Sequence, residues 1–172
     1  GDHAYINAPS GANLYFQDGG TNNMVIDSSG KVGIGTTAIP HGGVGYAKFA
    51  IEGTYNNAAG PHVQYSVSSD DYPVFQQLNW GHDNVHMFFD SYYDGAFKSS
   101  DAGSNFSISK ESDVLQIKYD SGISAGSALT WNSGLTLNTS GNVGIGTASP
   151  DRSLHVWTGT AGSVTGNANA PL

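Results

Sequence analysis

The chain has 172 residues, a net charge of −8 at neutral pH and no cysteine. This composition excludes disulfides and cysteine-based metal or thiol chemistry, and its few lysines and arginines argue against nucleic acid or anionic membranes as partners. Hydrophobic residues make up only 38% of the chain and lie in short runs, none long enough to span a membrane. Because this is little apolar material for the core of one chain, we expect several chains to share a core.

Residues 1–53 contain the first copy of an internal repeat, which is the first feature to seek in any sequence. The pattern Gly-x-Val-Gly-Ile-Gly-Thr at 30–36 returns at 141–147, and residues 24–29 match 135–140 at the same offset. Each copy predicts a strand, a Ser-Gly turn, a glycine-spaced strand, a proline-marked corner and a further strand.

The glycine-spaced strand has two different faces. In the first copy Val32 and Ile34 share one face, and Gly33 and Gly35 share the other. A bare glycine face lets another backbone approach closely, so we expect it to pack against a neighbouring chain. A nucleotide-binding loop is the alternative, but a phosphate site of that kind needs a helix after the glycines, and proline and further glycines follow here.

Residues 54–126 form an aromatic-rich insert between the copies, which we call the head. Period-two alternation and turn residues predict a small antiparallel unit without helices. The predicted strands are residues 62–68, 74–80, 85–93, 96–98, 105–110 and 114–119. Residues 127–159 are the second repeat copy, and residues 160–172 are a loop or the start of a further module.

Aromatic side chains near the predicted turns of the head are the best binding candidates. Rings pair with the apolar faces of sugars, neighbouring polar groups bind sugar hydroxyls, and loops on a rigid β-scaffold are a common place for recognition. Tyr92 and Tyr93 are adjacent on a strand, so one of them should point outward. The alternative is that these rings complete the core. The candidate ligand-binding residues are Tyr72, Trp80, His82, Asp83, Tyr92, Tyr93, Asp94 and Phe97.

Two other chemistries are open but less favoured. His82, Asp83 and His86 have the side-chain types of a metal site, although surface or core histidines are the simpler interpretation, and we predict no metal or cofactor. A pair of carboxylates can hydrolyse a glycosidic bond. The head is rich in aspartate, but most of these residues fall in predicted turns and no spacing singles out a pair, so we predict no enzymatic activity. The aspartates are Asp70, Asp71, Asp83, Asp90, Asp94 and Asp101.

The repeat pattern Ser-Gly-x-Val-Gly-Ile-Gly-Thr, followed by a proline corner and Leu-x-Val, resembles the stalk repeat of trimeric phage tail fibres. It is also similar to segments of the mosaic adhesive trimers of predatory bacteria. The head is similar to a module of such proteins at residues 72–76, 82–85, 89–106 and 119–122. The self-cleaving chaperone that often ends these fibres has no counterpart after Pro150, so the resemblance assigns no autoproteolysis.

This resemblance implies an all-β fold: an intertwined parallel homotrimer in which stalk repeats flank a small antiparallel head. It implies an extracellular location, on a virion tail fibre or a bacterial cell surface. The expected function is attachment to a receptor, such as a cell-surface glycan of a host or prey cell. A purely structural spacer that holds a separate tip is the alternative, and a polysaccharide depolymerase is a third.

Overall fold

The computed structural model describes residues 3–40, 45–55 and 59–157. Every regular element in this part of the chain is a strand, which confirms the all-β prediction. No helix among the described residues is long and apolar enough to cross a bilayer. The chain divides into two compact units, Gly1–Pro61 and His62–Leu172, and each is described here by itself. Residues 160–172, predicted to be a loop or a new module, lie outside the described residues.

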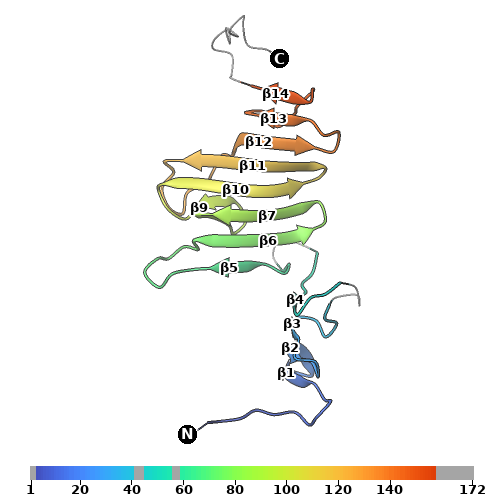
Figure 1. The fold of residues 1–172 in the computed structure, drawn as a ribbon. Helices are drawn as coiled ribbons and strands as arrows, with labels where there is room; N and C mark the ends of the chain where they lie inside the picture. The colour runs from blue at the N-terminus through green and yellow to red at the C-terminus, as the bar shows by residue number, and fades with distance from the viewer. Residues whose placement is uncertain (1–2, 41–44, 56–58, 158–172) are drawn as a thin grey trace, which may run out of the picture. The chain divides into compact units, whose positions relative to one another are not determined.

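The first unit contains a four-stranded sheet with the order β1-β2-β3-β4 (Figure 1). Its strands are β1 (Leu14–Asp18), β2 (Thr21–Ile26), β3 (Val32–Ile34) and β4 (Phe49–Ile51). The first three pair in antiparallel fashion through tight turns, whereas β4 lies parallel to β3. A parallel neighbour requires the chain to leave the sheet and return, which is the task of the predicted proline corner.

The second unit contains an eight-stranded sheet with the order β14-β13-β12-β11-β10-β7-β6-β5. It is antiparallel except between its last two strands in the sequence, β13 and β14. The sheet continues without interruption across residue 126, where the sequence suggested a boundary between head and repeat. Its strands are β5 (Val63–Tyr65), β6 (Phe75–Gly81), β7 (Asn84–Phe89), β10 (Ser104–Glu111), β11 (Val114–Ser121), β12 (Asn132–Asn138), β13 (Val143–Ile145) and β14 (Leu154–Val156).

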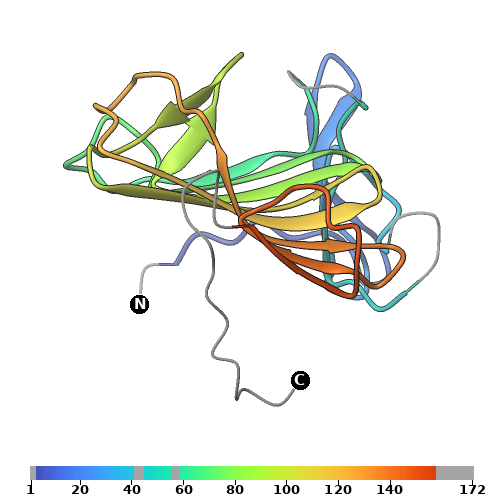
Figure 2. The ribbon, with the colours of Figure 1, turned by 90° about the horizontal axis from the view of Figure 1, so that it is seen from above.

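A separate hairpin of β8 (Ser91–Tyr93) and β9 (Phe97–Ser99) lies over one side of the eight-stranded sheet (Figure 2). The sequence predicted one strand over residues 85–93, which is wrong. Asp90 takes a left-handed backbone conformation, with φ of 49°, and ends β7. Its carbonyl oxygen accepts a hydrogen bond from the amide of Ser100 at 2.8 Å, which holds the hairpin where the chain leaves the sheet.

The two repeat copies share their backbone hydrogen bonds. Asp27 and Asn138 each accept the turn amide of the following glycine, at 2.9 Å and 3.0 Å, and their side chains bind the same turn in both copies. The structure extends the repeat upstream of the matching sequence. β1 pairs with β2 as β11 pairs with β12, and both pairs have a register shift at the same place, after Phe16 and after Ile117. The repeating unit therefore has four strands.

The glycine faces of the repeats are filled by the chain itself. A Cβ atom on Gly33 would lie 2.3 Å from the carbonyl oxygen of Thr36 and 3.0 Å from Ile39, and one on Gly144 would lie 2.9 Å from Thr147. Each corner thus folds back over its own glycine. The expectation that a neighbouring chain packs on this face is wrong, because the chain's own corner occupies the space.

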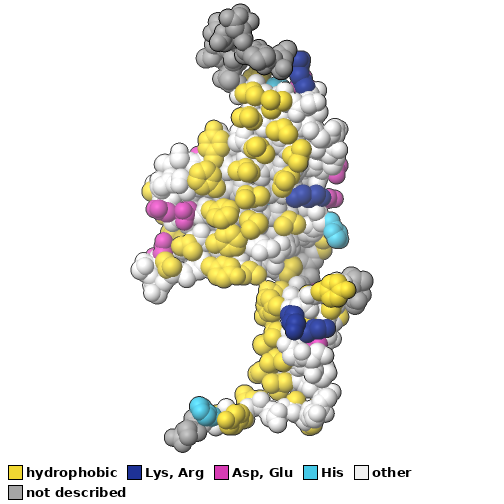
Figure 3. Space-filling view, in the orientation of Figure 1, with side chains coloured by type: hydrophobic (Ala, Val, Ile, Leu, Met, Phe, Trp, Pro, Cys, Tyr) yellow, Lys and Arg dark blue, Asp and Glu magenta, His cyan; other side chains and the backbone are white. Residues whose placement is uncertain are grey.

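The opposite face of both sheets is apolar and open to solvent. In the eight-stranded sheet the exposed side chains alternate with more buried ones along β7, β10, β11 and β12, and apart from the strand ends the exposed set is hydrophobic (Figure 3). We call this surface of the eight-stranded sheet the apolar face. Its members are Tyr65, Phe75, Met87, Phe89, Phe106, Ile108, Leu115, Ile117, Tyr119, Leu135, Leu137, Ile145, Leu154 and Val156.

The covered face of the same sheet is largely small and polar. Its buried side chains include Asn105, Ser107, Ser109, Gln116 and Thr136. Water-soluble antiparallel sheets usually do the reverse, with apolar residues inside and polar residues outside. The second unit therefore keeps its larger hydrophobic surface outside its own core.

The glycines with positive φ supply a first test. Gly141 and Gly146 have φ of 79° and 73°, but a Cβ on Gly141 meets open space, whereas one on Gly146 would lie 2.5 Å from the carbonyl oxygen of Trp157. We expect Gly141→Ala to cost about 1 kcal/mol of unfolding free energy for its strained backbone. Gly146→Ala should cost more, because it also displaces β14. Chemical denaturation of both variants measures the difference, and equal losses would contradict this account.

Candidate functional site

The hairpin of β8 and β9 is held to the sheet by a cluster of rings, which we call the covered cluster. Phe97 packs at ring-centroid distances of 5.1 Å from Tyr93, 5.6 Å from Phe88 and 5.8 Å from His86. Trp80 meets Tyr93 edge-on at 5.0 Å. Trp131, from the connection between β11 and β12, stacks on Phe88. The predicted ligand residues Trp80, Tyr93 and Phe97 are thus part of the packing that covers the small polar face.

Tyr92 lies on the other side of the hairpin strand, as alternation predicts. Its ring stacks on Tyr72 at 5.5 Å with an interplanar angle of 22°. Lys98 is the cross-strand partner of Tyr92, and its ammonium group binds the Asp94 carboxylate at 2.8 Å. We call these four residues the tyrosine patch. They combine half-buried aromatic surface with an exposed ion pair.

Three segments build the tyrosine patch: the turn before β6, the hairpin and the connection from β11 to β12. A Cβ atom on Gly126 would lie 2.6 Å from the hydroxyl of Tyr72, so the glycine makes room for that ring. Lys98 also bridges to Ala128 in the same connection. Partial burial and the nearby Asp94 raise the pKa of Tyr92, and the hydrogen bond to Asp94 raises the pKa of Lys98. The phenol and the ammonium group therefore keep their protons at neutral pH.

His82 and Asp83 lie apart from the tyrosine patch, in the turn between β6 and β7. Both are exposed, and the Asp83 carboxylate forms an ion pair with Lys110 that lowers its pKa. His86 is turned to the covered face and does not meet them. Within the described ranges no group of three or more His, Asp or Glu side chains is arranged to hold a metal ion. The structure thus separates the three residues that the sequence suggested as metal ligands.

The aspartates of the head have different surroundings. Asp83 and Asp94 are each engaged with a lysine. Burial raises the pKa of Asp90, and the charges of Asp101 and Asp70 raise it further. Its backbone nevertheless has a structural task, since the carbonyl oxygen of Asp90 accepts hydrogen bonds from the Ser100 amide and the Asn105 side chain.

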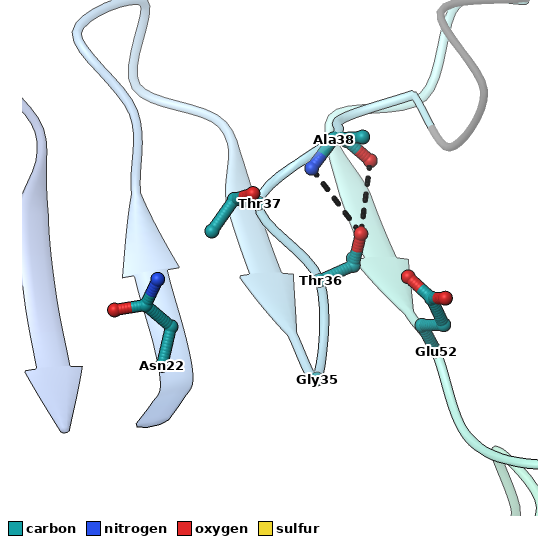
Figure 4. A pocket seen from close by; sticks show the side chains of 6 residues that line it. All are labelled: Asn22, Gly35, Thr36, Thr37, Ala38 and Glu52. Atoms are coloured by element: carbon teal, nitrogen blue, oxygen red, sulfur yellow. Dashed lines mark hydrogen bonds between the residues drawn. The ribbon is translucent and has the colours of Figure 1, made fainter. Parts of the chain in front are cut away.

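A shallow polar hollow in the first unit is lined by Asn22, Gly35, Thr36, Thr37, Ala38 and Glu52 (Figure 4). Thr36 bends back onto Ala38 through hydrogen bonds of its hydroxyl to the Ala38 amide and carbonyl, at 3.2 Å and 3.4 Å. The corner of the second copy repeats the bond to the amide, from Ser149 to Thr147. The hollow is therefore part of the repeat's corner, and it carries one carboxylate.

His86 is the most perturbed titratable group of the second unit. Its side chain is nearly buried among the rings of Trp80, Phe88 and Phe97, and Nε2 lies 2.6 Å from the Asn84 amide oxygen. Burial lowers its pKa to about 4, although Glu111 at 3.6 Å acts in the opposite direction. The sequence did not mark His86, Lys98 or Trp131 as partners of the hairpin, because their roles come from contacts between distant strands.

No protein-family model and no curated protein matches this chain. The resemblance to fibre proteins therefore rests on the sequence pattern, and the function is argued from the residues themselves.

The pKa of His86 predicts acid sensitivity. A histidine in the unfolded chain has a pKa near 6.5 and is protonated below that pH. In the native covered cluster His86 stays neutral down to about pH 4, so the unfolded chain binds more protons between these two values. The stability contributed by this site is present above pH 6.5 and is lost as the pH falls towards 4, by roughly 3 kcal/mol per chain. Denaturation curves of wild type and His86→Gln between pH 7 and pH 4.5 measure it. The variant should lose less stability over this range, and parallel losses would contradict the assignment.

Proposed function

We propose that the chain is a non-enzymatic segment of an extracellular fibre, on a virion tail or a bacterial cell surface. In this proposal it assembles as a homotrimer and attaches to a receptor, most simply a cell-surface glycan of a host or prey cell. The observation that carries the proposal is the apolar face of the second unit, which a single chain leaves in water.

The apolar face is too large and too regular for an isolated soluble chain. Large contiguous apolar patches on monomers mark interaction sites or aggregation. Here the exposed side chains include aromatic residues that are 38% to 60% exposed, among them Phe89, Phe106, Tyr119 and Tyr65. Covering such surfaces is the main favourable term in protein association. A second and third copy of the same chain are occupants of matching chemistry, because they bring equally apolar surfaces.

The charged groups of the second unit fit this assembly. Lys110 lies on the same side of β10 as Ile108, at the end of the strand, and its ammonium binds the carbonyl of His82 and the carboxylate of Asp83 at the turn between β6 and β7. Glu111 and Lys118 pair with each other on the covered side, next to His86. Assembly through the apolar face therefore leaves these charges with their partners.

Attachment is proposed for the tyrosine patch. It belongs to the hairpin side of the sheet, so it stays accessible when the apolar face is covered. A half-exposed tyrosine ring offers a flat surface to a sugar, and Asp94 and Lys98 supply an acceptor and a donor for hydroxyl groups. The remaining aromatic candidates, Trp80, Tyr93 and Phe97, support the patch from below through the covered cluster.

In the spacer alternative the chain still forms a trimer but binds no ligand. This alternative is favoured by the packing of Trp80, Tyr93 and Phe97 in the covered cluster. Of the aromatic candidates, Tyr72 and Tyr92 then remain outside that cluster. The depolymerase alternative is supported only by the raised pKa of Asp90. Its test is release of reducing ends from surface polysaccharide by wild type and Asp90→Asn.

Sedimentation equilibrium tests the assembly. We expect wild type to sediment as a trimer and Ile117→Asp to lose that state, because a carboxylate would be buried among apolar side chains of the other copies. Ala125→Asp, on the exposed connection at the covered side, is the control and should remain trimeric. Circular dichroism checks that each variant is folded. A folded wild-type monomer would refute the proposal.

A glycan array tests attachment. We expect the wild-type trimer to bind a defined set of glycans, and Tyr92→Ala to weaken that binding at least tenfold by removing the flat surface. His82→Ala, at an exposed position away from the patch, should bind as wild type does. If the trimer binds no glycan on the array, the spacer alternative is favoured. If Tyr92→Ala binds normally, recognition lies elsewhere.

A further inference from the structure

We infer that the tyrosine patch selects uncharged sugars and rejects glycans that present a carboxylate or sulfate to it. This inference rests on the proposed attachment and adds the chemical class of the ligand. It is carried by the distribution of charge around the two stacked rings and by the ion pair that occupies the cation beside them.

The segments that build the tyrosine patch contain far more acid than base. They are residues 69–73, 90–101 and 122–131, and Lys98 is the only lysine or arginine in these three stretches. The same stretches contain five aspartates, so the surroundings of the two rings have a negative net charge. The aspartates are Asp70, Asp71, Asp90, Asp94 and Asp101.

The carboxyl groups lie at both ends of the hairpin and in the neighbouring turn. Asp94 is in the turn between β8 and β9, whereas Asp90 and Asp101 flank the hairpin at its other end. The Asp70 carboxylate accepts a hydrogen bond from the amide of Tyr72 at 3.0 Å, in the segment that carries one of the stacked rings. Burial raises the pKa of Asp90, and the charges of Asp101 and Asp70 raise it further, so these three groups lie close enough to interact.

The positive charge of Lys98 is compensated within the patch. Its ammonium binds the Asp94 carboxylate at 2.8 Å. That hydrogen bond raises the pKa of Lys98, and the nearby phenols of Tyr92 and Tyr72 act in the same direction. An anionic sugar can therefore reach this cation only by displacing Asp94, and it meets the other carboxylates on the way. A sugar hydroxyl needs no such exchange.

The rings add to this discrimination. An aromatic ring has partial negative charge over its face and partial positive charge at its edge. The apolar face of a sugar presents C–H hydrogens, which suit a tyrosine face, whereas a carboxylate over the same face is repelled. Partial burial holds the pKa of Tyr92 above its ordinary value, so its phenol keeps its proton and can donate a hydrogen bond to a sugar hydroxyl.

Matched pairs of glycans that differ by one terminal sialic acid test the inference, with the wild-type trimer on the same array. Where the neutral member binds, we expect the sialylated member to bind about tenfold more weakly at low salt, near 0.05 M. The Debye length falls from about 10 Å at 0.1 M salt to about 3 Å at 1 M, so the difference should nearly vanish at about 1 M salt.

A charge reversal beside the rings gives a second measurement. Asp71 is exposed and adjacent to Tyr72, and we expect Asp71→Lys to reduce the difference between neutral and sialylated glycans about threefold. Asp113→Lys is the matched control, because it makes the same change of charge at another exposed turn. That turn joins β10 to β11 at the end of β10 away from the hairpin, so the difference should stay as in wild type. Sedimentation checks that both variants are trimeric.

Equal or tighter binding of the sialylated glycans would overturn the inference. A difference that salt does not reduce, or that Asp71→Lys leaves unchanged, would also overturn it, because the rejection would then be steric rather than electrostatic. Failure of the proposed function is seen separately. A wild-type trimer that binds no glycan of either kind removes the attachment itself, and this inference with it.

Discussion

The second unit depends on the coverage of a small polar sheet face by a layer of rings. Ser107 and Ser109 occupy positions where most sheets place aliphatic side chains, and the rings of Phe88, Phe97 and Trp131 pack on that side of the sheet. The covered cluster fixes which face of the sheet is internal. The opposite, hydrophobic face therefore lies outside the chain's own core, and the proposed assembly rests on that exposed surface.

Much of the fold follows from alternation in the sequence. Phe106 to Lys110 and Leu115 to Tyr119 alternate cleanly, and both stretches are strands of the structure. Period-two patterns do not say which face is internal, because a polar face can be buried when rings cover it. The break at Asp90 was missed because the aromatic pairs Phe88-Phe89 and Tyr92-Tyr93 on either side of it favour one strand, whereas its positive φ goes with tertiary hydrogen bonds to its carbonyl oxygen.

The candidate site was predictable in part. Alternation correctly placed Tyr92 and Tyr93 on opposite sides of one strand, with Tyr92 facing Tyr72 and Tyr93 facing Phe97. The sequence grouped His82 with these residues because they share a segment, but the turn carries its side chain elsewhere. The role of Lys98 could not be predicted from the sequence, because its cross-strand position opposite Tyr92 follows from the length of the hairpin turn rather than from any motif.

The shared strand position of β1 and β11 has a consequence for how such a chain tolerates change. The segments Leu-Tyr-Phe-Gln-Asp and Leu-Gln-Ile-Lys-Tyr agree in one residue, yet both present apolar side chains at alternate positions to the same repeat and shift register at the same point. The first strand of each repeat, β1 or β11, therefore needs apolar side chains at alternate positions and backbone hydrogen bonds to the next strand. The amino acids of this first strand can vary widely, so different modules can supply it without any change in the three strands that follow.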